Sequence, residues 1–443
     1  MSGGALVAEV LVRHGVRFLF TLCGGHISPI LVEAKARGVK VVDTRHEATA
    51  VFAADAVARL TGVPGVAAVT AGPGVTNTLT ALQNARLAQS PLVLLGGATA
   101  TILRGRGALQ DIDQLALVKP IVKWATAVTK VRDLVPALER AFLVCREGVP
   151  GPVFVECPVD LLYEEPLVRS LFAGKSGEPK GLVETATKWY LGRHLDSIFA
   201  GAGDAAPRDP EAVPPPAPEA GSVGTAALLL ARAERPVVVL GSGALMSPAD
   251  APALARAVSG LGLPTWLSGT ARGLLGPSSP SQLRHRRKEA LREADLVLLA
   301  GVPCDFRLDY GRQISRSATL VSVNRDRRAL TLNRRPTLAV NGDPGLFLRA
   351  LADETPGGFP RAAWLGRLRE RDAARDAEIE AAPGGKKAAL DPVGFCRQIE
   401  EALPSPSVVV ADGGDFVATA SYVLRPRGPL SWLDPGVFGT LGV

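Results

Sequence analysis

An acidic side chain that follows a predicted strand is the first residue of this sequence suited to chemistry. Glu47 lies in residues 43–48, where an apolar run gives way to a helical pattern. A carboxylate at the mouth of such a turn can serve as a buried acid. The same residues also fit a capping box, with Thr44 as the N-cap and Glu47 at the third helical position. The two interpretations share a local geometry and differ in how deeply Glu47 is buried.

A glycine-rich turn in residues 69–77 is the second candidate. A predicted strand leads into Gly72 and Gly74, and a helical segment with Asn77 follows. Such turns let the backbone approach a ligand closely and direct helix N–H groups toward it. The pattern is not that of a P-loop, because the lysine of G-x-x-x-x-G-K-[ST] is missing. An ordinary tight turn between a strand and a helix is the alternative.

Polar residues in other loops could contact a substrate. His26 ends the glycine-rich run 23–26 and could change its charge near neutral pH, although a loop histidine is often only a polar surface residue. Gln110, in a polar loop, could hydrogen-bond a substrate. Residues 241–243 (Gly-Ser-Gly) resemble a nucleotide-binding turn, but Met246 interrupts the full G-x-G-x-x-G pattern.

The elements that must position these residues alternate between short apolar runs and helical patterns. This alternation is typical of parallel sheets with helices on both faces, so we expect an α/β fold of tandem parallel-sheet domains. The predicted strands are residues 39–42, 66–69, 92–95, 153–155, 236–240, 295–300, 320–323 and 408–411. The predicted helices include residues 249–261, 362–381 and 392–402.

The same pattern divides the chain into five segments. We expect a domain at residues 1–165, a linker at 166–222, a middle domain at 223–355, a linker with a helix at 356–390, and a third domain at 391–443. The run 201–221 suggests a linker because it is rich in Ala, Pro and Gly. The third segment has too few strands to close a parallel sheet, so we expect that domain to be incomplete.

Composition excludes several classes of function. The net charge of +7 is modest for 443 residues, and no dense Lys/Arg block with interleaved aromatics occurs, so we expect no nucleic-acid partner. The five cysteines form no C-x-x-C pair, which argues against a zinc site or structural disulfides. No apolar run is long enough to span a bilayer, and we expect a soluble chain.

The order and spacing of these motifs resemble the thiamine-diphosphate-dependent enzymes of the acetolactate synthase and 2-hydroxyacyl-CoA lyase family. The resemblance covers essentially the whole chain and implies a pyrimidine-binding, a middle and a diphosphate-binding domain. The stretches that carry it are residues 24–29, 44–47, 70–74, 301–307, 412–416 and 438–442.

The resemblance also implies roles for the candidate residues. Glu47 becomes the catalytic glutamate that faces the aminopyrimidine ring of the cofactor and favours its imino tautomer. The other residues implied to line the cofactor in the first domain are Gly72, Gly74 and Asn77. His26 and Gln110 are implied to face the substrate.

In the third domain, the resemblance places Asp415 and Phe416 near the diphosphate, and Gly439 and Leu441 at the backbone clamp and apolar wedge that bend the cofactor. The cofactors implied are thiamine diphosphate and Mg²⁺. The oxygen ligands for Mg²⁺ are expected beyond Val443, so we expect no metal ligand within the chain and a fragment or short form that is inactive alone. FAD is a less favoured occupant of the middle domain.

The activity that the resemblance implies is carbon–carbon cleavage of a 2-hydroxyacyl-CoA to an aldehyde and formyl-CoA. Two alternatives stay open, namely an acetolactate-synthase-like carboligase and a non-catalytic nucleotide- or CoA-binding partner subunit. A homodimer or homotetramer is implied because the family's site lies between subunits. For the full-length relative, the resemblance implies the endoplasmic reticulum membrane, reached through an N-terminal anchor. We expect no such anchor in this chain, which could then be cytosolic.

Overall fold

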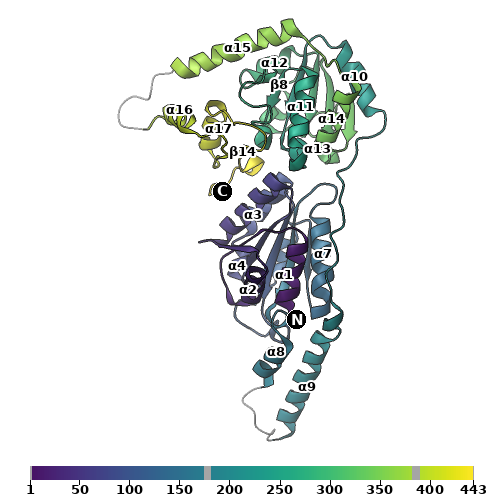
Figure 1. Ribbon diagram of the computed structural model, residues 1–443, viewed down its shortest axis with the longest axis vertical. Coiled ribbons are helices and arrows are strands. Elements are labelled where there is room, and N and C mark those ends of the chain that lie inside the picture. The colour runs from purple at the N-terminus through teal and green to yellow at the C-terminus, as the bar shows by residue number, and fades with distance from the viewer. Residues whose placement is uncertain (1, 174–180, 382–389, 443) are drawn as a thin grey trace. The chain divides into compact units, whose positions relative to one another are not determined.

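Two compact units, divided between residues 213 and 214, make up the chain. The computed structural model describes residues 2–173, 181–381 and 390–442. Each unit contains a six-stranded sheet in which every pair of neighbouring strands is parallel (Figure 1). This arrangement confirms the predicted α/β fold with tandem parallel sheets.

The sheet of the first unit has the strand order β2-β1-β3-β4-β6-β5. Strands β3, β4 and β6 are buried along their whole length, which explains why their sequences are continuous apolar runs. The strands are β1 (Phe18–Thr21), β2 (Lys40–Asp43), β3 (Gly65–Val69), β4 (Leu92–Ala98), β5 (Trp124–Ala127) and β6 (Pro152–Pro158). The predicted strands in this unit are therefore confirmed, with ends that differ by up to three residues.

Helices cover both faces of this sheet. Helices α1, α2 and α7 pack together over one core, while α3 and α5 pack against each other. The helices of the unit are α1 (Gly3–Arg13), α2 (Ser28–Ala36), α3 (Glu47–Thr61), α4 (Pro73–Thr76), α5 (Leu79–Ala88), α6 (Gln114–Val118), α7 (Leu134–Val144), α8 (Glu165–Ala173) and α9 (Leu182–Phe199).

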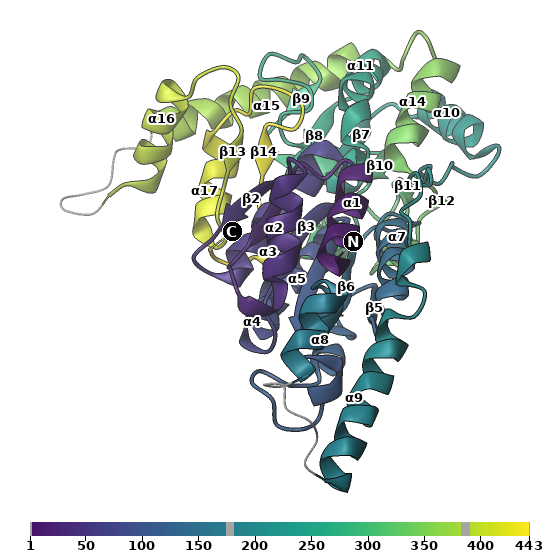
Figure 2. The same ribbon diagram turned by 60° about the horizontal axis from the view of Figure 1, so that its bottom comes forward.

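Helices α8 and α9 lie in the segment 166–222, which we expected to be a linker, and they pack side by side (Figure 2). The last turn of α9 enters the core through Leu195, Ile198 and Phe199. Residues 165–173 and 182–199 are therefore helical. The sequence did not predict α9 because only the last turn of this helix is buried, so its sequence carries little apolar periodicity.

The sheet of the second unit has the strand order β12-β11-β10-β7-β8-β9. Successive side chains of β7 enter opposite cores, since Val237 and Val239 join one cluster and Val238 and Leu240 the other. The strands are β7 (Pro236–Leu240), β8 (Thr265–Leu267), β9 (Gln282–Leu283), β10 (Leu296–Ala300), β11 (Thr319–Asn324) and β12 (Leu338–Asn341). The helices are α10 (Ser222–Arg232), α11 (Ala251–Leu261), α12 (Arg287–Glu293), α13 (Arg327–Thr331), α14 (Pro344–Glu354) and α15 (Ala362–Ala381).

The C-terminal part of the second unit contains helices α16 (Pro392–Ala402) and α17 (Asp415–Val423) and a parallel pair of strands, β13 (Val409–Val410) and β14 (Trp432–Leu433). Trp432 is fully buried, and the guanidinium of Arg272 lies 5.6 Å from its ring centroid. Whether this segment begins a third domain stays a prediction. No helix of the described residues is both long and apolar enough to cross a membrane.

Candidate active site

The loops that follow β1, β2, β3 and β4 carry the predicted site residues of the first unit. Because these strands are parallel and adjacent, their carboxyl ends meet at one edge of the sheet. His26 follows β1, Glu47 follows β2, the Gly72 turn follows β3, and Gln110 follows β4. Tertiary structure therefore gathers at this edge residues that lie far apart in the sequence.

Glu47 is the first residue of α3 and is only 6% exposed. The N-cap is His46, whose Nδ1 accepts a hydrogen bond from the backbone N–H of Ala48 at 3.1 Å. Thr44 instead donates its hydroxyl to the carbonyls of Thr21 and His46. The capping-box interpretation is therefore wrong, and the buried position agrees with the interpretation of Glu47 as a buried acid.

One carboxyl oxygen of Glu47 accepts a hydrogen bond, and the other is open to a ligand. Asn77, at the end of α4, donates from Nδ2 to Oε2 of Glu47 at 2.9 Å. Among the described residues, no hydrogen-bond donor contacts Oε1. Oε1 is not one of the fully buried oxygens that lack a partner, so it keeps exposed surface and is free to accept or share a hydrogen bond with a ligand.

The β3–α4 turn requires glycine at two positions, because neighbouring residues approach its backbone closely. Gly72 has a φ of 62°, and a Cβ there would lie 2.9 Å from Cβ of Gln110. A Cβ on Gly74 would lie 2.9 Å from Cγ2 of Thr70. Any side chain at either position would fill space next to this turn or displace its neighbours. The structure thus brings Gly72 and Gln110 together.

Gln114, which we did not predict as a site residue from the sequence, links this turn to β4 and β6 by hydrogen bonds. Its side chain is 2% exposed and accepts from the N–H of Gly72 at 2.9 Å. Its Nε2 donates to the carbonyl of Gly97 at 3.1 Å and to Oε2 of Glu156 at 2.8 Å. Glu156 is 1% exposed and pairs with Arg104. A carboxylate inside the apolar strand β6 is the signal that could have identified this network.

A cavity of about 340 Å³ adjoins the network. Its lining includes Arg104, Asp111, Gln114 and Glu156. Because Gln114 also contacts Gly72, this cavity and the β3–α4 turn share a wall.

His26 belongs to the same cluster of loops. Its Nδ1 lies 3.0 Å from Oγ1 of Thr70, and its Cβ lies close to Gly97, where a Cβ would approach within 2.6 Å. Burial lowers the pKa of His26, so its imidazole is neutral at pH 7. A neutral imidazole can accept a hydrogen bond or a proton.

Similarity to known proteins agrees with this geometry. Residues 1–117 match the N-terminal TPP binding domain of thiamine pyrophosphate enzymes, and residues 223–351 match their central domain. The whole chain is 50% identical to 2-hydroxyacyl-CoA lyase 2 of Danio rerio and of Homo sapiens, covering 72% and 70% of those proteins. The chain belongs to the thiamine pyrophosphate enzyme family. It is also 33% identical over its whole length to the acetolactate synthase large subunit IlvG of Mycobacterium tuberculosis, covering 74% of it.

The first unit fits the cofactor that defines thiamine pyrophosphate enzymes. The open Oε1 of Glu47 can meet a ring nitrogen, and the neighbouring turn is held close by, with Gly72 packed against Gln110 and Gly74 against Thr70. Within the described ranges, no group of three or more His, Cys, Asp or Glu side chains could hold a metal ion.

The C-terminal residues predicted for this thiamine pyrophosphate enzyme lie at the start of α17 and in a loop near the C-terminus, and these two segments pack together. Asp415 begins α17 and Phe416 is 70% exposed. Gly439 has a φ of 65° and Leu441 is 62% exposed. The loop before α17 contacts the loop near the C-terminus through Asp412, which accepts from the N–H of Gly442 at 3.0 Å. Both pairs are therefore neighbours within the second unit, and their contact with a cofactor stays a prediction.

Proposed function

We propose that this protein is a thiamine-diphosphate-dependent lyase that cleaves a 2-hydroxyacyl-CoA to an aldehyde and formyl-CoA. The observation that carries the proposal is the buried Glu47, with one oxygen fixed by Asn77 and the other open. The 50% identity to 2-hydroxyacyl-CoA lyase 2 supports the choice of substrate. When bound, thiamine diphosphate supplies the carbon nucleophile and the electron sink for carbon–carbon cleavage.

In this proposal Glu47 holds a proton between Oε1 and the pyrimidine ring. Asn77 orients the carboxyl group by occupying Oε2, and Gln114 fixes the turn at Gly72 against the sheet. A carboxyl group held in one orientation exchanges its proton with a ring nitrogen without first reorganising its surroundings.

The substrate side of the proposed site is formed by His26 and Gln110. The neutral His26 can accept a hydrogen bond from the 2-hydroxyl group, whose proton must leave before the adjacent carbon–carbon bond breaks. In the second unit, Asp415, Phe416, Gly439 and Leu441 would contact the cofactor, and Mg²⁺ would neutralise its diphosphate.

Carboligation of pyruvate is the second candidate, and the identity of 33% to IlvG favours it. The two activities share the cofactor and the role of Glu47, so they differ in the substrate that the site accepts. The higher identity to the lyases favours cleavage as the leading proposal.

The test combines cofactor binding with product analysis. The purified full-length protein, with thiamine diphosphate and Mg²⁺, is given either a 2-hydroxyacyl-CoA or pyruvate, and formyl-CoA, aldehyde and acetolactate are measured by mass spectrometry. Calorimetry on the same preparation measures cofactor binding. Formyl-CoA that depends on Glu47 supports the lyase, whereas acetolactate alone supports the carboligase. Cofactor binding that Glu47→Gln leaves unchanged, together with no product from either substrate, would overturn the proposal.

A further inference from the structure

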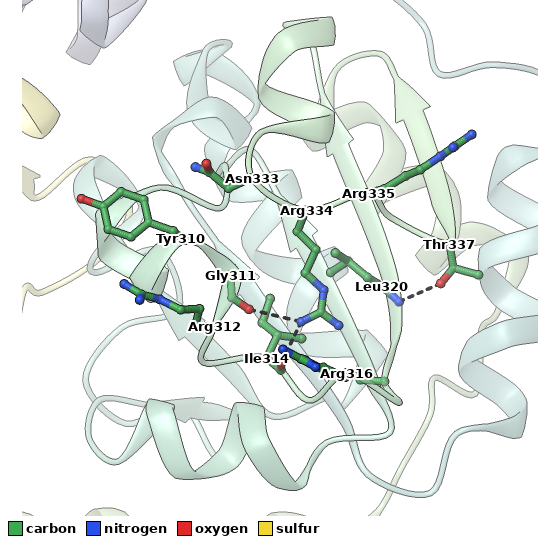
Figure 3. Close-up of a pocket in the computed structure, with 11 residues that line it drawn as sticks. Tyr310, Gly311, Arg312, Ile314, Arg316, Leu320, Asn333, Arg334, Arg335 and Thr337 are labelled. Carbon is green, nitrogen blue, oxygen red and sulfur yellow. Dashed lines mark hydrogen bonds between the residues drawn. The ribbon is translucent and has the colours of Figure 1, made fainter.

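A basic cavity lies at the amino-terminal ends of β11 and β12 in the second unit. Its volume is about 620 Å³. Its walls come from the loop that precedes β11 and the loop that precedes β12 (Figure 3). The Gly241 turn follows β7, at the opposite edge of this parallel sheet. The cavity is therefore separate from the turn that the sequence suggested for nucleotides.

Four arginines line this cavity, and no carboxylate does. They are Arg312, Arg316, Arg334 and Arg335. Arg312 pairs with Asp309 at 2.7 Å, but the side chain of Arg312 is 70% exposed, so this ion pair contributes little stabilisation. Among the described residues, no carboxylate forms an ion pair with the other three. The cavity consequently carries an uncompensated positive charge.

Arg334 fixes the loop that forms one wall of the cavity. Its guanidinium donates to the carbonyls of Gly311 at 3.2 Å and Ile314 at 2.6 Å, and Figure 3 shows it reaching across to that loop. It also donates to the carbonyl of Ser315 at 2.6 Å. Gly311 has a φ of 81°, and a Cβ there would lie 3.2 Å from Cβ of Arg334. The loop is thus held in place before any ligand binds.

The rest of the cavity is suited to an organic group. Ile314 and Leu320 are buried apolar residues in its lining, and Tyr310 is 51% exposed at its rim. The volume lies within the range of small-molecule sites, about 300–1,000 Å³. Guanidinium groups bind phosphate oxygens with strong, charge-assisted hydrogen bonds.

We propose that this cavity binds a small organic phosphate of mononucleotide size, with its phosphates at the arginines and its organic part against Tyr310 and the apolar lining. This site goes beyond the proposed lyase function, because Glu47 lies in the first unit and the cavity in the second.

Calorimetry with the full chain tests the proposal, with ADP, inorganic pyrophosphate and adenosine as probes. ADP and pyrophosphate should bind and compete, while adenosine should bind at least about tenfold more weakly because it lacks phosphate. Arg316→Ser and Arg335→Ser, combined, should weaken ADP binding by about tenfold or more, and the corresponding lysine variants should retain part of it. Arg256→Ser, an exposed change of the same charge on α11, is the control.

The melting temperature of each variant establishes that the second unit is folded. Both substituted arginines are exposed and make no hydrogen bond to the described part of the chain, so their removal should leave it unchanged. Absence of ADP and pyrophosphate binding at millimolar concentration would overturn the proposal. Binding that the double variant leaves unchanged, or that Arg256→Ser weakens equally, would also overturn it. The lyase proposal is tested by different residues and products, so either can fail alone.

Discussion

Asn77 donates a hydrogen bond of 2.9 Å to Glu47, and the two residues are 30 positions apart in the chain. Glu47 begins the helix after β2, whereas Asn77 ends the short helix after β3. These strands are separated only by β1 in the sheet, so their following turns are close neighbours. The contact orients the one buried carboxyl group on which the proposed function depends.

In the full-length protein, replacing Glu47 by Gln should abolish activity and leave the fold intact. The amide keeps an acceptor for Asn77, so the free energy of unfolding should change by no more than about 1 kcal/mol. Loss of the carboxyl proton should lower kcat at least about 100-fold. The matched control is Glu33→Gln, a half-buried change on α2 that removes the pair with Arg37, which should retain full activity. A Glu47→Gln enzyme with near-normal kcat would rule out the catalytic role.

Gly72→Ala should destabilise the first unit more than Gly107→Ala does. Both glycines have a positive φ, so both variants carry backbone strain of about 1–3 kcal/mol. Only at position 72 would the new Cβ meet a neighbour, Gln110, whereas position 107 is open. The extra cost should be about 1–3 kcal/mol, measured by urea unfolding. Equal losses would mean that the turn can move away from Gln110.

Gln114→Leu should cost about 2 kcal/mol of stability, because it leaves the N–H of Gly72 and Oε2 of Glu156 without a hydrogen-bond partner. It should also weaken thiamine diphosphate binding by releasing the turn. Gln83→Leu on α5, whose side chain makes no hydrogen bond to the described residues, should change stability by no more than about 0.5 kcal/mol. Calorimetry and urea unfolding measure the two effects, and indistinguishable behaviour of the two variants would contradict the assigned role of Gln114.

Breaking a buried ion pair of the second unit should lower the stability more than breaking an exposed one. Arg325 and Asp343 are 5% and 3% exposed, with Nε of the arginine 2.8 Å from the carboxylate. Arg325→Met leaves that carboxylate buried and unpaired, at an expected cost of about 3–5 kcal/mol. Arg349→Met breaks the exposed pair with Asp250 and should cost less than about 1 kcal/mol. Equal shifts of the urea midpoint would show that Asp343 gains another partner or water.

Stability should fall in acid partly through His14. Burial, followed by the nearby charge of Arg146, lowers the pKa of His14 from 6.5 to about 4. Between these values the unfolded chain binds a proton that the folded chain does not. The stabilising contribution is therefore full above about pH 6.5 and is lost as the pH falls toward 4.

His14→Leu removes this titration. The wild type should lose about 1–2 kcal/mol more than the variant between about pH 7 and 4.5, after allowance for partial solvent screening. Urea unfolding at a series of pH values measures the difference. Parallel curves for the two proteins would show that His14 is protonated in the folded chain as easily as in the unfolded one.

Local pattern was enough to predict most of the sheet and part of the site. The segments that form β3, β4, β7 and β10 are apolar because both faces of each strand are covered. A strand buried on both faces needs consecutive apolar residues, and such a run can be recognised in the sequence. Gly72 and Gly74 were identifiable because a positive φ or a close approach selects glycine locally. The order and spacing of several motifs, that around Glu47 among them, indicated the family, which similarity to known proteins confirmed.

The sequence by itself determined the parallel α/β fold, the family and the identity of the candidate acid. Tertiary structure decided that His46 caps α3, that Asn77 orients Glu47, and that Gln114 joins the β3–α4 turn to Glu156. The reason is physical: strand and turn preferences depend on neighbouring residues. Contacts between distant polar groups, by contrast, depend on the strand order β2-β1-β3-β4-β6 and on which carboxyl ends it brings together.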